Sequence, residues 1–172
     1  MNINIYNDLS KYSFISNDIN NSNFKKPISL SKEKLISLTK ALSEIKRYGY
    51  EIVDLSLDNL LFYKDTLYRI ISLDKAKIGS PINDFLYVID SYIDLEEEYY
   101  SNDYAIDLIL TIASVYDKYT EELDLGYELY WYFINKINNS PKDSDIYNKY
   151  DNKLRFVIKY KPYLDELHQE EI

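Results

Sequence analysis

The chain has 172 residues, of which 29 are acidic and 20 basic, so its formal net charge is −9. It contains no cysteine and one histidine, His168, which excludes disulfide scaffolds, thiolate zinc sites and cysteine nucleophiles and argues against a Ser-His-Asp hydrolase or a polyhistidine metal centre. Only three residues are glycine, which excludes a Gly-rich phosphate-binding loop.

The first part of the chain is polar and rich in Asn and Ser, with Pro27 near its end. This composition predicts one short helical turn around Asp8–Tyr12, followed by a loop. We therefore divide the chain into a polar N-terminal segment, residues 1–30, and a single helical domain, residues 31–172.

A helix is predicted to begin after Ser31, which is a suitable N-cap. Glu33 then lies in the first turn, where the helix dipole favours an acidic side chain. Apolar residues recur at three- and four-residue spacing from Leu35 to Ile45, which is the pattern of an amphipathic helix. Gly49 is a typical C-terminal cap and is expected to close the segment.

The apolar pattern changes after this helix. Leu60–Tyr63 and Leu67–Leu73 are short β-prone runs, and the polar residues 64–66 between them predict a β-hairpin. The fold class is therefore mainly α with a small β-hairpin (α+β).

Further helical patterns follow the hairpin. One opens at Pro81 and continues to Tyr92, before an acidic run, Asp94–Glu98, that we interpret as a solvated surface segment. The others are expected at about Asp103–Lys118, at about Glu122–Asn138 and from Asp145 onward. Pro162 is expected to kink or split the last of them.

Charge and composition limit the partners and the compartment. A net charge of −9 with few arginines argues against binding to a nucleic-acid backbone, and the same field repels anionic membranes. No run approaches the roughly 18 apolar residues of a spanning helix. The first residues lack the basic and apolar regions of a signal peptide. We expect a cytoplasmic protein that binds neither nucleic acid nor membrane.

One stretch carries a pattern of chemical interest. Asp54 follows the first helix, and Asn59, five residues later, enters the apolar run of the hairpin. The hairpin leads into Ile-Ile-Ser-Leu-Asp, residues 70–74, and Pro81-x-x-Asp84-Phe opens the next helix. This order of motifs resembles the C-terminal lobe of protein kinases and of the related aminoglycoside- and choline-type kinases.

The resemblance implies roles for four residues. In that family the catalytic loop supplies an Asp that orients the acceptor hydroxyl and an Asn that holds magnesium, and the D-F-G segment supplies the main magnesium-binding Asp. By resemblance, Asp54 and Asn59 take the two loop roles, Asp74 is a substitute magnesium ligand, and Asp84 ties the loop to the following helix. Simpler readings stay open, because Asp54 and Asn59 can cap a turn and Asp84 can be an ordinary helix N-cap.

The chain also departs from the family pattern. Ile52 and Val53 replace the His and Arg of the catalytic-loop motif, and Ser72 stands where the magnesium-binding Asp is expected. Serine is a poor ligand for magnesium, and Asp74 lies two residues, roughly 6.6 Å of strand, beyond that position. The residues before Asp54 are too few for a nucleotide-binding lobe, so the resemblance implies a C-lobe alone.

These departures favour a catalytically impaired, pseudokinase-like protein that binds a protein partner or regulates one, as an immunity or inhibitor-type factor does. No cofactor and no metal site are expected. The tyrosine-rich composition suggests Tyr130, Trp131 and Tyr132 as partner-binding residues, although most of this aromatic set is expected in the core.

Two alternatives remain open. One is a phosphotransferase whose nucleotide lobe comes from a partner chain; it would use Mg-ATP, with Asp54 as base and Asn59 and Asp74 as metal ligands. The other is an unrelated helical adaptor.

Overall fold

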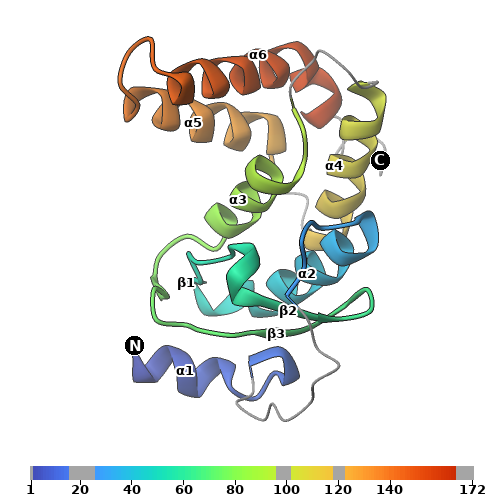
Figure 1. The fold of residues 1–172 in the computed structure, drawn as a ribbon, viewed down its shortest axis with the longest axis vertical. Helices are drawn as coiled ribbons and strands as arrows, with labels where there is room; N and C mark the ends of the chain where they lie inside the picture. Colours follow the sequence, from blue (N-terminus) through green and yellow to red (C-terminus); the bar gives the residue numbers. More distant parts are fainter. Residues whose placement is uncertain (1, 16–25, 96–101, 118–122, 166–172) are drawn as a thin grey trace. The chain divides into compact units, whose positions relative to one another are not determined.

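A computed structural model describes residues 2–15, 26–95, 102–117 and 123–165 of the chain (Figure 1). They belong to two compact units, Met1–Tyr92 and Ile93–Ile172. The predicted fold class is confirmed, since the described residues are mainly helical with small antiparallel strand pairs. The acidic residues 96–98 and His168 lie outside the described residues. The predicted division of the chain into residues 1–30 and 31–172 stays a prediction.

The first long helix of the first unit has the ends that the sequence predicts. In α2 (Lys32–Ile45) the Ser31 hydroxyl accepts a hydrogen bond from the Lys34 N–H at 3.3 Å. The short 3-10 turn η2 (Lys46–Tyr48) continues it to Gly49. Gly49 has a φ of +72°, a left-handed conformation that glycine adopts without strain, so it ends the helix as a C-terminal cap does.

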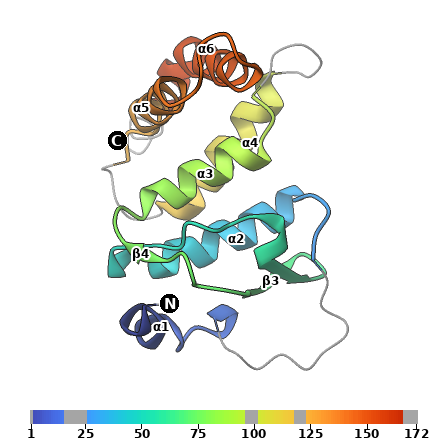
Figure 2. The ribbon, with the colours of Figure 1, turned by 60° about the vertical axis from the view of Figure 1, so that its left-hand side comes forward.

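The predicted hairpin is present and packs on α2. It consists of β2 (Leu60–Tyr63) and β3 (Thr66–Ile70), and the 3-10 turn η3 (Leu57–Asn59) precedes it. Leu60 pairs with Ile70 and Tyr63 with Thr66, with one irregularity between Leu61 and Phe62. Figures 1 and 2 both show this hairpin between α2 and the N-terminal segment, so both of its faces are covered.

The N-terminal segment is helical earlier than predicted. α1 (Ile3–Leu9) begins after Asn2, whose side chain accepts hydrogen bonds from two backbone N–H groups of the first turn, and the 3-10 turn η1 (Ser13–Ile15) follows. The segment buries four apolar side chains: Ile5, Leu9, Phe14 and Ile15. Its polar composition therefore conceals an apolar face that contributes to the core of the first unit.

A second strand pair, which the sequence did not indicate, joins the two ends of the stretch around the hairpin. β1 (Tyr50–Glu51) pairs with β4 (Lys77–Ile78) in antiparallel register. The buried Glu51 side chain accepts hydrogen bonds from the Ser80 N–H at 2.8 Å and from Asn83 Nδ2 at 2.9 Å. These contacts hold the start of α3 (Ile82–Tyr92) against β1, the strand that follows α2 and η2.

All regular elements among the described residues of the second unit are helices. It contains α4 (Asn102–Tyr116), α5 (Leu125–Asn138) and α6 (Asp145–Asp165), with α5 and α6 packed along each other (Figure 1). Of the two predicted effects of Pro162, a kink or a split, the split does not occur, because α6 continues through this proline although it provides no N–H for the helix. None of the described helices has both the length and the apolar surface that crossing a membrane requires.

Candidate functional site

The stretch from Ile52 to Asn59, called here the loop segment, is fixed to α3 by one carboxylate. Asp84, in the first turn of α3, is buried, with 4% of its surface exposed. Its Oδ2 accepts a hydrogen bond from the Ile52 N–H at 2.7 Å and its Oδ1 from the Val53 N–H at 3.0 Å. At the other end of α3, the Tyr92 hydroxyl donates to the Leu55 carbonyl. The loop segment is thus held at two points by one helix.

Burial makes Asp84 sensitive to pH. Desolvation raises the pKa of this carboxyl from 3.8 to about 6, although the hydrogen bonds from Ile52 and Val53 favour its charged form. The folded protein therefore binds this proton more tightly than the unfolded chain. The resulting stabilisation is fully present below the ordinary pKa and is lost as the pH rises through 6.

We expect this titration to appear in the free energy of unfolding. Between about pH 5 and about pH 8, Asp84 should contribute a loss of about 1.4 kcal/mol. Urea unfolding of the wild type and of Asp84→Asn at both pH values isolates this contribution, because the other titrating groups affect both proteins alike. Parallel pH profiles would show that burial does not shift the pKa of Asp84.

Val53 holds a backbone conformation that is unfavourable for its side chain. Its φ is +72°, in the left-handed region, where a β-branched residue is strained. Val53 is 37% exposed, so its removal takes less apolar surface from the core than removal of a fully buried valine would. The hydrogen bond to Asp84 and the packing of the loop segment therefore hold Val53 in place against local strain.

Replacing Val53 with glycine should stabilise the protein. Glycine adopts this conformation freely, and the relief of strain should exceed its larger entropy loss on folding by about 1 kcal/mol. Thermal unfolding should give a higher Tm for Val53→Gly and a lower one for the control Val88→Gly, since Val88 is buried in α3. A lower Tm for Val53→Gly would mean that its side chain supplies more packing energy than its backbone costs.

Asn59 is the central connection of the loop segment. Its side-chain amide is buried, and Nδ2 donates to the Asp54 carbonyl at 2.7 Å and to the Ser72 carbonyl at 2.9 Å. Its Oδ1 accepts a hydrogen bond from the Ser72 N–H at 2.8 Å. Both N–H groups of the amide and its oxygen are thus engaged with main-chain groups.

The Asp54 side chain makes a local turn. Its Oδ1 accepts hydrogen bonds from the Ser56 N–H at 3.2 Å and from Ser56 Oγ at 2.7 Å. Asp74 is exposed, and its backbone N–H donates to Ser72 Oγ at 3.0 Å. A series of hydrogen bonds therefore connects Asp54, Asn59, Ser72 and Asp74, so the three candidate catalytic residues belong to one connected segment. Within the described ranges, no three acidic, His or Cys side chains lie close enough together to hold a metal ion.

No family model, curated protein or solved structure matches this chain. The resemblance to kinases is therefore a prediction from the order of motifs in the sequence.

The aromatic candidates of the second unit differ in exposure. Trp131 is 47% exposed, whereas Tyr130 and Tyr132 are half-buried. Tyr127, one turn earlier on α5, is 51% exposed, and its ring centroid lies 6.4 Å from that of Trp131. The exposed part of this surface is therefore the pair Tyr127 and Trp131. Their spacing of four residues on one helix is a signal that the sequence already contains.

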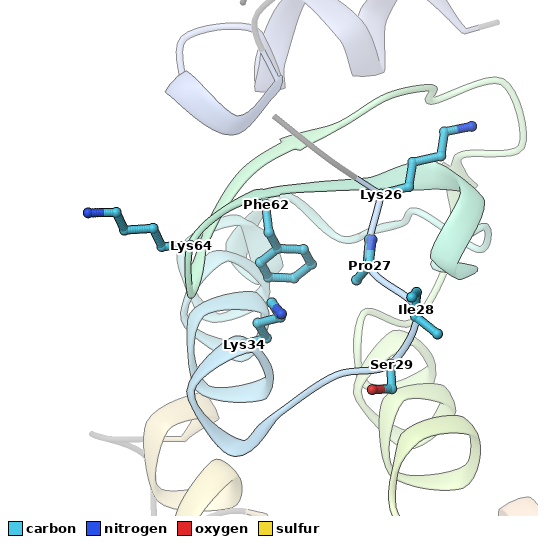
Figure 3. A pocket seen from close by; sticks show the side chains of 7 residues that line it. All are labelled: Lys26, Pro27, Ile28, Ser29, Lys34, Phe62 and Lys64. Atoms are coloured by element: carbon cyan, nitrogen blue, oxygen red, sulfur yellow. The ribbon is translucent and has the colours of Figure 1, made fainter. Parts of the chain in front are cut away.

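Besides the exposed Tyr127, the sequence did not predict a hollow in the surface of the first unit. A hollow of about 380 Å³ in the first unit lies between the loop before α2, the start of α2 and the end of β2. Lys26, Lys34 and Lys64 line it together with Phe62, and we call it the lysine hollow (Figure 3). No spacing in the sequence indicates it, because a loop, a helix and a hairpin turn each supply one lysine.

Proposed function

We propose that this chain is a catalytically impaired, kinase-like protein that acts in the cytoplasm as a protein-binding or regulatory module. The observation that carries the proposal is the engagement of Asn59. Its amide oxygen is directed at the Ser72 N–H and its Nδ2 donates to the Asp54 and Ser72 carbonyls, so the side chain holds the loop segment together through main-chain groups and not through an ion. Asn59 thus serves the structure of the loop segment.

The neighbouring position supports the same conclusion. Ser72 occupies the place where the family resemblance puts the main magnesium-binding Asp, and its Oγ accepts the Asp74 N–H. Phosphoryl transfer depends on positioned cations and on electrostatic stabilisation of the transferred group. A site in which a hydroxyl replaces the anionic ligand lacks the main means of holding the metal.

The contacts of Asp84 favour a kinase-like scaffold over an unrelated adaptor. In the family that the motif order resembles, a buried Asp of the next helix ties the catalytic loop in place. Asp84 makes such a tie to the N–H groups of Ile52 and Val53. An ordinary N-cap would accept hydrogen bonds from its own helix instead.

A nucleotide titration tests the loss of catalysis. We expect neither a rise in Tm nor a heat of binding when ATP and magnesium are added together. The control variant Asp54→Asn keeps a side-chain oxygen for Ser56 and removes the charge of the candidate base. A rise in Tm with Mg-ATP that this variant abolishes would contradict the proposal and favour the phosphotransferase completed by a partner chain.

A matched capture experiment tests the binding role. The exposed rings of Tyr127 and Trp131 are suited to anchor a protein interface, since both residue types are frequent at binding hot spots. Proteins of the producing cell that bind the wild type should be lost with Tyr127→Ala/Trp131→Ala and retained with Tyr163→Ala. Tyr163 is a similarly exposed tyrosine on α6. Equal capture by all three proteins would contradict a binding role for this pair.

A further inference from the structure

Three lysines line the lysine hollow of a strongly acidic chain, and Figure 3 shows the Lys34 ammonium beside Phe62 and the ammonium groups of Lys26 and Lys64 directed outward. Lys26 comes from the loop before α2, Lys34 from the first turn of α2 and Lys64 from the hairpin turn. None of the described residues that line the hollow is acidic, although the chain has 29 acidic residues. Among the described residues, no Asp or Glu forms an ion pair with any of these three lysines. The charge of the hollow is therefore available to an external anion.

Part of the wall of the hollow is apolar, formed by Pro27, Ile28 and Phe62. Figure 3 shows Phe62 and Lys34 on one side and Pro27 and Ile28 on the other, and the Lys34 Nζ lies 6.0 Å from the centroid of the Phe62 ring. Ile28 is 96% exposed, an unusual degree for a large apolar side chain beside a hollow. A ligand that fills this space meets cations and apolar surface together.

We propose that the lysine hollow binds an acidic segment of a partner protein. One apolar side chain of that segment packs against Pro27 and Ile28, and carboxylates on either side of it face Lys34 and Lys64. A hollow of about 380 Å³ is large enough for one such side chain.

The other anions are less suited to this site. A small phosphate would leave the apolar walls without a contact and would find no arginine fork. A nucleic acid presents a continuous row of phosphates, which the overall charge of −9 repels. An acidic segment with an apolar side chain uses both properties of the hollow.

This inference goes beyond the proposed function, because it concerns a different surface from the pair Tyr127 and Trp131. The nucleotide titration can fail while the hollow still binds an acidic segment, and the reverse also holds. The two proposals are therefore tested separately.

The probe is a fluorescein-labelled peptide of about eight residues, long enough when extended to span roughly 26 Å. It consists of Glu and Asp with Phe and Leu at its centre, and fluorescence anisotropy measures its binding to the full chain. A peptide with serine at the centre tests the apolar contact, and one with lysine in place of the acidic residues tests the charge. We expect the first peptide alone to bind, with an affinity that falls as salt increases.

Charge reversal locates the binding site. Lys34→Glu/Lys64→Glu should weaken binding of the acidic peptide by about tenfold or more, because attraction becomes repulsion at two positions. Lys40→Glu/Lys75→Glu makes the same change in net charge at two exposed lysines outside the hollow and should change the affinity less than about twofold.

A substitution at the apolar wall provides independent evidence. Ile28→Ser removes an exposed side chain that supports no core packing, so the fold should be retained while binding weakens about threefold or more. Equal weakening by both charge-reversal pairs would overturn the proposal, as would equal binding of the peptide with the serine centre. Stronger binding of a single-stranded oligonucleotide at the hollow would overturn it in favour of nucleic acid.

Discussion

Replacing Asp84 with alanine is expected to lower the free energy of unfolding by about 3 kcal/mol at neutral pH. The change leaves two N–H donors without an acceptor: that of Ile52, a fully buried residue, and that of Val53. Each lost partner of a buried donor costs about 1–3 kcal/mol. Removing the buried charge of Asp84 offsets part of this loss. The expected decrease in the free energy of unfolding is therefore smaller than the sum of the largest costs for the two N–H donors.

Asp84→Asn is the matched control for this prediction. The asparagine amide retains one oxygen, so it can still accept one of the two hydrogen bonds, and about half of the loss is expected. Urea unfolding monitored by circular dichroism measures both variants. A loss of less than about 0.5 kcal/mol for Asp84→Ala would show that water or a backbone shift satisfies the loop segment without the carboxylate.

The parts of the fold that the sequence predicted correctly depend on local signals. Ser31 and Gly49 mark the ends of α2 and its continuation because a hydroxyl cap and a left-handed glycine act within a few residues of their own position. The hairpin was predictable for the same reason, since β-prone runs on both sides of a polar turn pair with each other.

The parts that were missed depend on contacts between distant segments. β1 and β4 contain two residues each, too few to show any alternation, and their pairing joins positions far apart in the chain. In α1, Ile5 and Leu9 are four residues apart and form a buried stripe, but the Asn and Ser residues around them dominate the composition. Average polarity therefore concealed an amphipathic helix.

The sequence indicates that Asp54 and Asn59 lie near each other, but it does not determine their hydrogen bonds. The sequence placed Asp54 and Asn59 near each other, yet an amide five residues after a carboxylate is compatible with a metal ligand or with a turn. Only the positions of the main-chain groups of Asp54 and Ser72 decide where the hydrogen bonds of Asn59 go. Likewise, an Asp in the first turn of a helix can cap its own helix. It can also accept a hydrogen bond from the backbone of another segment, as Asp84 does from Ile52.

Asn59→Asp is expected to destabilise the protein by about 4 kcal/mol, more than Asn59→Ala. Aspartate keeps an oxygen for the Ser72 N–H, but it places a second oxygen against the Asp54 and Ser72 carbonyls, where the asparagine donates two hydrogen bonds. Two part-buried acceptors then lose their donor and face a charge of the same sign. Alanine leaves both carbonyls and also the Ser72 N–H without a partner, but it adds no repulsion, so its effect should be about 3 kcal/mol.

Magnesium makes this pair of variants informative about function. If Asn59 were a metal ligand, an added carboxylate would strengthen the site, and magnesium would restore stability to Asn59→Asp but not to Asn59→Ala. If Asn59 is a structural connection, as we propose, magnesium should leave the urea midpoints of both variants unchanged. A selective rise for Asn59→Asp would therefore reverse the assignment of this residue and, with it, the argument that the loop segment has lost its metal.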